Sequence, residues 1–342
     1  MANGDSGRGG AGVQSRIEIP SGLTEDDLRG MYELMALARA LDERMWVLNR
    51  AGEAPFVISV QGHEAAQAGM AFALKPGRDV LAPYYRDLAL VLHFGITPRS
   101  VMCSLFGKLG DTSSQGRQMP AHYGGREQKI LTGSSPVATQ YPHAVGAALA
   151  MKLRGEDGVA LTSVGEGGTS QGDWHEALNF AAVHRLPVVF MVENNGWAIS
   201  VPQKEQMAVG SVAERAAAYG MPGISVDGGD PLAVYAVVRQ AVERARRGEG
   251  PTLIEARVYR FTAHSSDDDD RSYRPAEELK EQRQHDPNKR FRETLLESGV
   301  LSQDTAAAID QRVRAAIDDA TEFAEQAPYP DPADLLQNVY GS

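Results

Sequence analysis

Hydrophobic and polar positions follow a clear pattern in the middle of the chain. Residues 159–164 form a short apolar run that is compatible with a buried strand. Residues 173–184 have the apolar spacing of a helix, and residues 187–193 form a second apolar run of strand length. Strand, helix and strand in this order predict a βαβ unit.

The downstream sequence continues the alternation. Residues 224–226 and 253–258 predict two more strands, and residues 232–246 predict the helix between them. Because strands that alternate with helices pair in parallel and are covered on both sides, we expect an α/β fold. It would have three layers, with helices on both faces of a mostly parallel sheet.

The remaining segments predict how the chain is divided. Upstream, Thr24 and Asp27 match a variant of the capping box, and a long amphipathic helix is expected after them. Residues 107–126 are rich in Gly, Ser and Gln, which indicates a long loop. Residues 1–16 predict a disordered tail without a signal peptide, and residues 328–342 predict a C-terminal tail. One α/β domain would therefore occupy residues 17–327.

Composition excludes some classes of function. The formal charge of −11 argues against nucleic acid as the main partner, because phosphate binding depends on clustered Lys and Arg. No apolar run approaches the roughly 20 residues of a membrane-spanning helix. Cys103 is the only cysteine, so an intrachain disulfide is impossible and a cytoplasmic location is expected. Its apolar neighbours predict that the thiol is buried.

Polar residues suited to a cation follow both strands of the βαβ unit. Glu166 lies between glycines after the first strand, and Asn194 and Asn195 follow the second. Ligands bind where parallel strands end, and glycines let backbone N–H groups approach an anion. A carboxylate, an amide oxygen and a backbone carbonyl, with phosphates as further ligands, suit magnesium. The pattern therefore predicts a magnesium-diphosphate site.

Two other interpretations of this segment are less favoured. Residues 168–172 match G-x-S-x-G with Ser170 as nucleophile, and Asp230 and His264 follow in the order of a serine hydrolase. In such enzymes the serine comes directly off the strand, whereas residues 165–167 intervene here. The hydrolase interpretation also leaves the two asparagines without a role. A dinucleotide site is disfavoured because the last glycine of its fingerprint is missing.

Two further segments carry candidate chemistry. His264 follows the last predicted strand, and four aspartates at 267–270 come soon after it. We expect these carboxylates to favour the imidazolium and to keep the pKa of His264 suitable for general acid or base catalysis. Tyr84, Tyr85 and Arg86 combine aromatic surface with a cation that suits phosphate or carboxylate. The simpler alternatives are core packing for the tyrosines and a solvated loop for the aspartates.

Taken together, these residues resemble the α subunit of the thiamine-diphosphate-dependent, decarboxylating component of 2-oxo acid dehydrogenase complexes. The resemblance covers nearly the whole chain after the N-terminal tail. Besides the segment from Glu166 to Asn195, it rests on several blocks in the order of the family, at residues 62–65, 84–87, 116–120, 134–140, 264–267 and 273–274.

The resemblance implies a bound thiamine diphosphate and its magnesium ion. The side chains of Glu166 and Asn195 and the carbonyl of Trp197 would hold the magnesium. Residues around the cofactor would be Tyr84, Tyr85, Arg86, Ser135, Val137, Gly165, Glu166, Gly167, Gly168, Asn195, Trp197, Ile199 and His264. Val137 would enforce the bent cofactor, and His264 would be catalytic. By the same analogy, a structural potassium ion would be held by Ser134, Pro136, Thr139 and Gln140.

The resemblance also implies the reaction and the partners. The family oxidatively decarboxylates a 2-oxo acid and transfers the acyl group to the lipoyl group of an acyltransferase partner. A β subunit would supply the pyrimidine-binding domain in a heterotetramer of two α and two β chains. Segments 259–274 and 330–336 favour a branched-chain substrate, whose pocket residues would be Phe56, Tyr85, Met119 and Ser135. A pyruvate or acetoin dehydrogenase and a non-catalytic assembly subunit remain alternatives.

Overall fold

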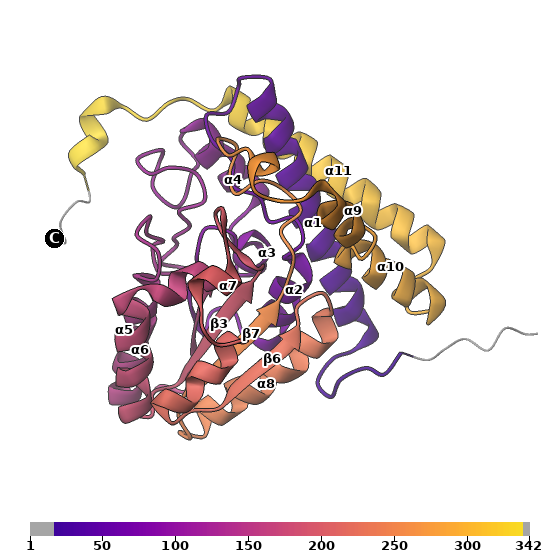
Figure 1. Cartoon of the computed structure of the whole chain (residues 1–342). Coiled ribbons are helices and arrows are strands. Elements are labelled where there is room, and N and C mark those ends of the chain that lie inside the picture. Colours follow the sequence, from indigo (N-terminus) through magenta and orange to yellow (C-terminus); the bar gives the residue numbers. More distant parts are fainter. Residues whose placement is uncertain (1–16, 338–342) are drawn as a thin grey trace, which may run out of the picture.

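The computed structural model describes residues 17–337, so the predicted tail at 1–16 and residues 338–342 lie outside the described part. Five strands form one sheet in the order β1-β2-β3-β7-β6, and every neighbouring pair is parallel (Figure 1). A separate antiparallel hairpin is formed by β4 and β5. The strands are β1 (Val80–Ala82), β2 (Ala160–Gly165), β3 (Val188–Asn194), β4 (Trp197–Ala198), β5 (Val201–Pro202), β6 (Gly223–Asp227) and β7 (Thr252–Arg257).

Helices surround the sheet. The α-helices are α1 (Glu25–Arg50), α2 (Glu64–Ala73), α3 (Leu88–His93), α4 (Pro98–Phe106), α5 (Gln140–Arg154), α6 (Gly172–Val183), α7 (Gln203–Gln206), α8 (Pro231–Arg246), α9 (Ala276–Arg283), α10 (Pro287–Glu297) and α11 (Gln303–Gln326). Short 3₁₀ segments are η1 (Glu166–Ser170), η2 (Val212–Tyr219), η3 (Asp270–Ser272) and η4 (Pro332–Leu336).

Each face of the sheet packs against its own hydrophobic core. Leu161, Val189 and Met191 belong to the core built with α1, α2 and α8. Ala160 and Val188, which point the opposite way, belong to the core built with α5 and α6. Since neighbouring side chains of a strand point to opposite faces, both faces of this buried sheet must be covered. The predicted three-layer α/β fold is confirmed, and the central sheet is entirely parallel.

The predicted helices and strands occur close to their expected positions. The βαβ unit consists of β2, α6 and β3, and α8 connects β6 to β7. The expected long helix is α1, and its capping box is present: Thr24 Oγ1 accepts from Asp27 N at 3.2 Å, and Asp27 Oδ2 accepts from Thr24 N at 2.8 Å. Capping residues therefore set the start of α1, as expected from the sequence.

Several other expectations can be compared with the described residues. Residues 107–126 form a loop, and Cys103 beside it is fully buried, as predicted. Residues 328–337 include η4, and the carbonyl of Pro328 accepts from Leu109 N at 2.9 Å. Within residues 17–337, no helix combines the length and apolar composition needed to cross a membrane. The division of the chain at residue 327 stays a prediction.

Candidate functional site

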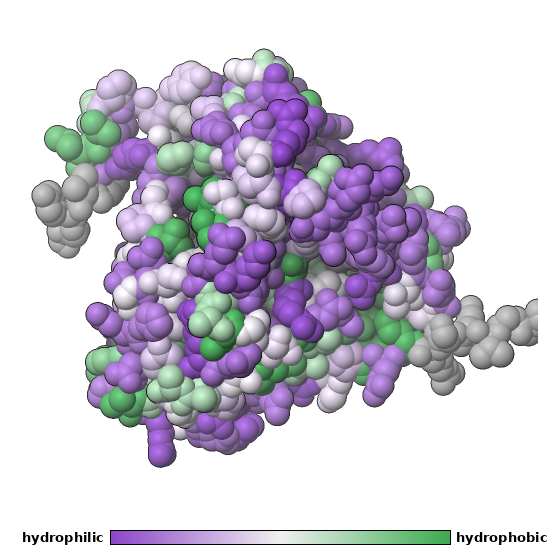
Figure 2. All heavy atoms as spheres, in the orientation of Figure 1, coloured by the Kyte–Doolittle hydropathy of each residue, from purple (hydrophilic) through white to green (hydrophobic). Residues whose placement is uncertain are grey.

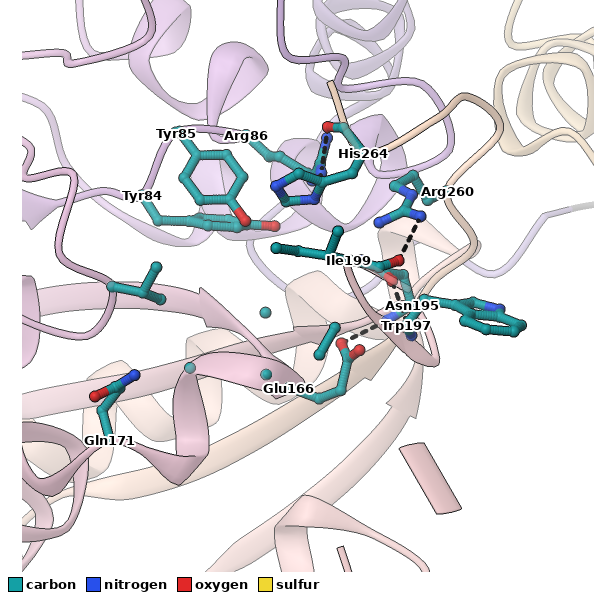
Figure 3. A pocket seen from close by; sticks show the side chains of 15 residues that line it. Tyr84, Tyr85, Arg86, Glu166, Gln171, Asn195, Trp197, Ile199, Arg260 and His264 are labelled. Atoms are coloured by element: carbon teal, nitrogen blue, oxygen red, sulfur yellow. Dashed lines mark hydrogen bonds between the residues drawn. The ribbon is translucent and has the colours of Figure 1, made fainter. Parts of the chain in front are cut away.

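A cavity of about 230 Å³ lies where β1, β2, β3 and β7 end (Figure 3). Figure 2 shows one face of the molecule, on which hydrophilic and hydrophobic residues are mixed. The cavity is lined by Tyr84, Tyr85, Arg86, Val137, Gly165, Glu166, Gly167, Gly168, Gln171, Asn195, Trp197, Ala198, Ile199, Arg260 and His264. The fold therefore brings together residues from five separate segments of the chain.

Glu166 and Asn195 meet at one side of the cavity. Glu166 begins η1 directly after β2, and Asn195 follows β3. Glu166 Oε2 accepts from Asn195 N at 3.1 Å, whereas the buried Oε1 has no hydrogen-bond partner among the described residues. Burial raises the pKa of Glu166. Because an unpartnered buried carboxylate oxygen is unfavourable and a hard cation satisfies it, this pair fits a magnesium ion.

Glycines keep the floor of the cavity free of side chains. A β-carbon on Gly168 would overlap Val164 and lie 2.8 Å from Val137 Cγ1. A β-carbon on Gly167 would lie 2.8 Å from the Ala198 Cβ. Both contacts are closer than packed carbon atoms tolerate, so only glycine fits at these two positions without movement of the chain. This leaves the room near the backbone that a phosphate group requires.

Arg86 and His264 face the cavity from the opposite side. The Arg86 guanidinium is buried and donates from Nη1 to the Ser59 carbonyl at 2.7 Å. Its Nη2 donates to the His264 carbonyl at 2.9 Å and lies 3.1 Å from His264 Nδ1. The Tyr85 ring lies beside both residues, with its centroid 6.0 Å from that of the His264 ring. This corner therefore presents a cation, an imidazole and an aromatic face together.

The electrostatic expectation for His264 is wrong. Burial, together with the positive charges of Arg86 and Arg260, lowers the pKa of His264 to about 4. Of the aspartates that follow it, Asp268 accepts a hydrogen bond from the backbone N of His264 at 2.7 Å. Its negative charge raises the pKa of the imidazole, but by less than burial and the two arginines lower it. His264 is therefore neutral at physiological pH.

A buried polar cluster lies behind Tyr84. Tyr84 Oη donates to Glu193 Oε2 at 3.1 Å. This carboxylate oxygen also lies 2.6 Å from His63 Nδ1. Gln67 Nε2 donates hydrogen bonds to Glu193 Oε2 at 3.2 Å and to the Arg86 carbonyl at 2.8 Å. Burial raises the pKa of Glu193 to about 7. These contacts hold the backbone of Arg86 and the ring of Tyr84 in place beside the cavity.

Three residues of the cavity were not predicted from the sequence: Gln171, Ala198 and Arg260. Arg260 is the most informative of them because its side chain is almost fully buried. The sequence does offer a signal for it, since an arginine between the end of a strand and a candidate catalytic histidine lies near the ligand edge of a sheet.

Other predicted residues lie away from the cavity lining. Ser135 is exposed, and its Oγ lies 2.6 Å from His122 Nε2. Phe56 lines a separate, mainly apolar cavity with Met45 and Tyr123 among its neighbours. Met119 is 51% exposed in the 107–126 loop. The described chain therefore does not bring these three residues together with Tyr85.

The four residues predicted to hold potassium lie before and at the start of α5. Gln140 is buried, and its Nε2 donates to the Ser163 carbonyl at 2.7 Å. Thr139 Oγ1 contacts Asp173 at 3.5 Å. Ser134 and Pro136 lie in the preceding loop. The Gln140 amide is thus used in packing α5 against β2.

The serine hydrolase alternative is wrong. Asp230 caps α8, accepting from Leu232 N at 2.9 Å and from Ala233 N at 3.2 Å. The Nδ1 atom of His264 is held by Arg86 instead of a carboxylate. Ser170 is within 3.3 Å of the Gln206 side chain. A catalytic serine needs a histidine oriented by an acid, and that arrangement is not formed.

Comparison with known proteins shows the family of the chain. The sequence pattern of the dehydrogenase E1 component family matches residues 32–333. This chain belongs to the dehydrogenase E1 component family. Relatives of this E1 chain include the 2-oxoisovalerate dehydrogenase subunit alpha of Bacillus subtilis (strain 168), which is 53% identical over 319 residues, covering 93% of this chain and 97% of the relative.

Two more distant relatives of the E1 chain are informative. The 3-methyl-2-oxobutanoate dehydrogenase subunit alpha of Mycobacterium tuberculosis (strain ATCC 25618 / H37Rv) is 42% identical over 318 residues, covering 93% of this chain and 84% of the relative. The pyruvate dehydrogenase E1 component subunit alpha of Bacillus cereus is 38% identical over 319 residues, covering 93% of this chain and 83% of the relative. The E1 chain is thus more similar to these two branched-chain relatives than to this pyruvate enzyme.

Proposed function

We propose that this E1 chain is the α subunit of a branched-chain 2-oxo acid dehydrogenase. It would oxidatively decarboxylate the 2-oxo acid and pass the acyl group to the lipoyl group of an acyltransferase partner. The observation that carries this proposal is the buried, unpartnered Glu166 Oε1 beside Asn195 at the edge of a glycine-floored cavity. The 53% identity to a 2-oxoisovalerate dehydrogenase subunit supports the substrate class.

We assign the cofactor thiamine diphosphate and its magnesium ion to this cavity. Glu166, Asn195 and the Trp197 carbonyl would hold the ion, and Gly167 and Gly168 would leave room for the diphosphate. When bound, thiamine diphosphate supplies the nucleophilic carbon and the electron sink that decarboxylation requires. Potassium at 134–140 remains part of the proposal on the family resemblance alone.

His264 would act as a neutral hydrogen-bond donor. Because the Arg86 guanidinium can only donate, its contact with Nδ1 leaves the imidazole proton on Nε2. A neutral imidazole with one fixed N–H can donate a hydrogen bond to a developing oxyanion and stabilise it, without a change in its own charge. Arg86 would at the same time attract the anionic diphosphate.

The substrate contact is assigned to Tyr85 among the residues suggested by resemblance, because its ring lines the cavity beside His264. Apolar pockets distinguish substrates that differ by a methylene by only about 1–3 kcal/mol. A clear but incomplete preference for branched 2-oxo acids over pyruvate is therefore expected.

We further propose that the cavity is completed by a β subunit in a heterotetramer of two α and two β chains, working in the cytoplasm. The apolar side chains of Ile199 and Val201 at the cavity hairpin are 53% and 42% exposed, which supports a partner on this side. The single, buried Cys103 suits a reducing compartment.

The test is a decarboxylation assay of the chain with and without its co-expressed β subunit. The substrates are 3-methyl-2-oxobutanoate and pyruvate, each at a range of concentrations. We expect activity only with both subunits and a higher kcat/KM for the branched substrate. Activity of the α chain alone would contradict the shared site, and a preference for pyruvate would contradict the substrate class. Cofactor binding without any decarboxylation would favour an assembly subunit.

A further inference from the structure

Ile199 has an unusual backbone conformation at the cavity. It is the first of two turn residues between β4 and β5, and its φ is +57°. A β-branched side chain is strongly disfavoured at positive φ, where hairpin turns usually place glycine or asparagine. Such a residue persists only when its surroundings hold it in place. The structure must therefore contain contacts that fix Ile199.

The side chain of Arg260 supplies a contact of this kind. Its Nη2 donates to the Ile199 carbonyl at 3.1 Å, as Figure 3 shows. The same nitrogen lies 3.1 Å from Tyr273 Oη, and Nε donates to the Thr262 carbonyl at 3.2 Å. Arg260 is 1% exposed. A buried donor with these three contacts restrains the turn more firmly than a mobile surface side chain would.

Arg260 is not held by a charge partner. Among residues 17–337 it forms no ion pair, and its Nη1 has no hydrogen-bond partner. Burying a guanidinium without a carboxylate is unfavourable, so a stabilising role in the fold does not by itself account for it. Its hydrogen bonds are instead directed at the backbone and a tyrosine beside the cavity.

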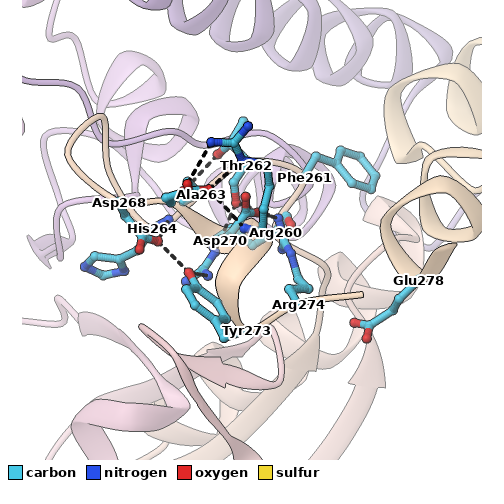
Figure 4. A network of polar contacts seen from close by, with 12 residues as sticks. Arg260, Phe261, Thr262, Ala263, His264, Asp268, Asp270, Tyr273, Arg274 and Glu278 are labelled. Carbon is cyan, nitrogen blue, oxygen red and sulfur yellow. Dashed lines mark hydrogen bonds and ion pairs between the residues drawn. The ribbon is translucent and has the colours of Figure 1, made fainter. Parts of the chain in front are cut away.

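The same arginine connects the hairpin to the segment of His264. Tyr273 Oη, which contacts Arg260, also donates to Asp268 Oδ2 at 2.5 Å. That carboxylate oxygen accepts from His264 N at 2.7 Å (Figure 4). Arg274 holds the backbone beneath this network, donating to the carbonyl of Thr262 at 3.0 Å. The Ile199 turn and the His264 backbone are thus joined through Arg260.

We propose that Arg260 is a positioning residue that holds Ile199 in its left-handed conformation and couples this wall of the cavity to the His264 segment. The Ile199 side chain then forms part of the cavity lining in a fixed orientation. The inference rests on the proposed function, because its consequence is measured as affinity for thiamine diphosphate. A direct contact between Arg260 and the bound anion is the competing explanation.

Glycine at position 199 separates the two explanations. Glycine adopts positive φ without help, so the turn would no longer need Arg260. The experiment is isothermal titration of thiamine diphosphate with magnesium into the complex of α and β subunits. It compares wild type, Arg260→Met, Ile199→Gly and the double variant. Arg260→Gln is measured in parallel in both backgrounds, together with the midpoint of thermal unfolding of every variant.

We expect Arg260→Met to weaken binding at least about 10-fold when Ile199 is present, as for loss of a charged hydrogen bond. In the Ile199→Gly background, the same change should weaken binding of the cofactor less than about 3-fold. If the arginine variants assemble only together with Ile199→Gly, that rescue of folding supports the proposal equally.

The proposal is overturned if the cost of Arg260→Met is the same in both backgrounds, as direct anion contact requires. It is also overturned if the arginine variants fail to fold in both backgrounds, or if they bind as tightly as wild type. Failure of the wild-type complex to bind the cofactor would instead contradict the proposed function, so the two failures are distinguishable.

Discussion

Arg86 and His264 are joined twice at the cavity: the Arg86 guanidinium donates to the His264 carbonyl at 2.9 Å and lies 3.1 Å from its Nδ1. Because guanidinium has no acceptor, Nδ1 must accept and the ring proton must be on Nε2. One arginine therefore fixes the orientation and the tautomer of the histidine, and together with burial and Arg260 it keeps the ring neutral.

Replacement of His264 by alanine removes the proposed hydrogen-bond donor. We expect kcat to fall at least about 100-fold, as for the loss of a donor that stabilises a developing oxyanion. Steady-state decarboxylation by the αβ complex measures this, and titration of the cofactor shows whether binding is retained. A variant with wild-type kcat would exclude His264 from the chemistry.

The pH dependence of stability reports the charge of His264. Its pKa in the folded chain, about 4, is below its unfolded value of 6.5. The unfolded state therefore binds more protons between these values, and the wild type loses stability as pH falls through this range. Relative to His264→Gln, the loss should reach about 1–3 kcal/mol near pH 4, allowing for the partial exposure of the ring.

The comparison with His264→Gln cancels the titration of other groups that the two proteins share. Thermal unfolding of both complexes from pH 7 to pH 4 gives the difference. Equal shifts of the two midpoints would mean that His264 titrates near its ordinary pKa and that its neutral state is not enforced.

A methyl group on the cavity floor should disturb the site. Gly168→Ala places a β-carbon against Val164 and Val137, so we expect a loss of about 1–3 kcal/mol in stability and weakened cofactor binding. Gly172→Ala is the matched control, because a β-carbon at the start of α6 has no neighbour within 4 Å. Thermal unfolding and cofactor titration measure both effects. Equal behaviour of the two variants would contradict the packing described for Gly168.

The residues of the rejected hydrolase triad give another test. Asp230→Ala removes the N-cap of α8 and should cost about 1 kcal/mol of stability while kcat stays near wild type. Ser170→Ala should leave decarboxylation almost unchanged. A large loss of kcat in both variants, without a loss of cofactor binding, would indicate that Asp230 and Ser170 take part in the reaction.

Periodicity was sufficient to predict four of the five strands of the central sheet and the helices α6 and α8 that connect them. Apolar spacing located β2, α6, β3, α8 and β7. This was possible because an element that is buried on one or both faces has apolar residues at a regular spacing along the sequence. Capping chemistry at Thr24 marked the start of α1 for the same reason. The glycines and Glu166 also lay in a strand-to-helix connection whose position in the sheet is fixed by topology.

Properties that depend on distant neighbours were not predictable in the same way. The low pKa of His264 arises from burial and from the charges of Arg86 and Arg260, of which Arg86 is 178 residues away. The adjacent aspartates do not set it. The contact of Ser135 with His122 and the positive φ of Ile199 likewise follow from tertiary packing. Neither leaves a periodic pattern in the sequence.

The central claim is that Glu166 completes a magnesium-dependent cofactor site. Isothermal titration of thiamine diphosphate into the αβ complex, with and without magnesium, tests it most directly. Glu325→Ala, a change on the exposed side of α11, is the matched control for Glu166→Ala. We predict magnesium-dependent binding in wild type and in Glu325→Ala, and no detectable binding in Glu166→Ala. Binding that is independent of magnesium, or equally tight in Glu166→Ala, would contradict the account.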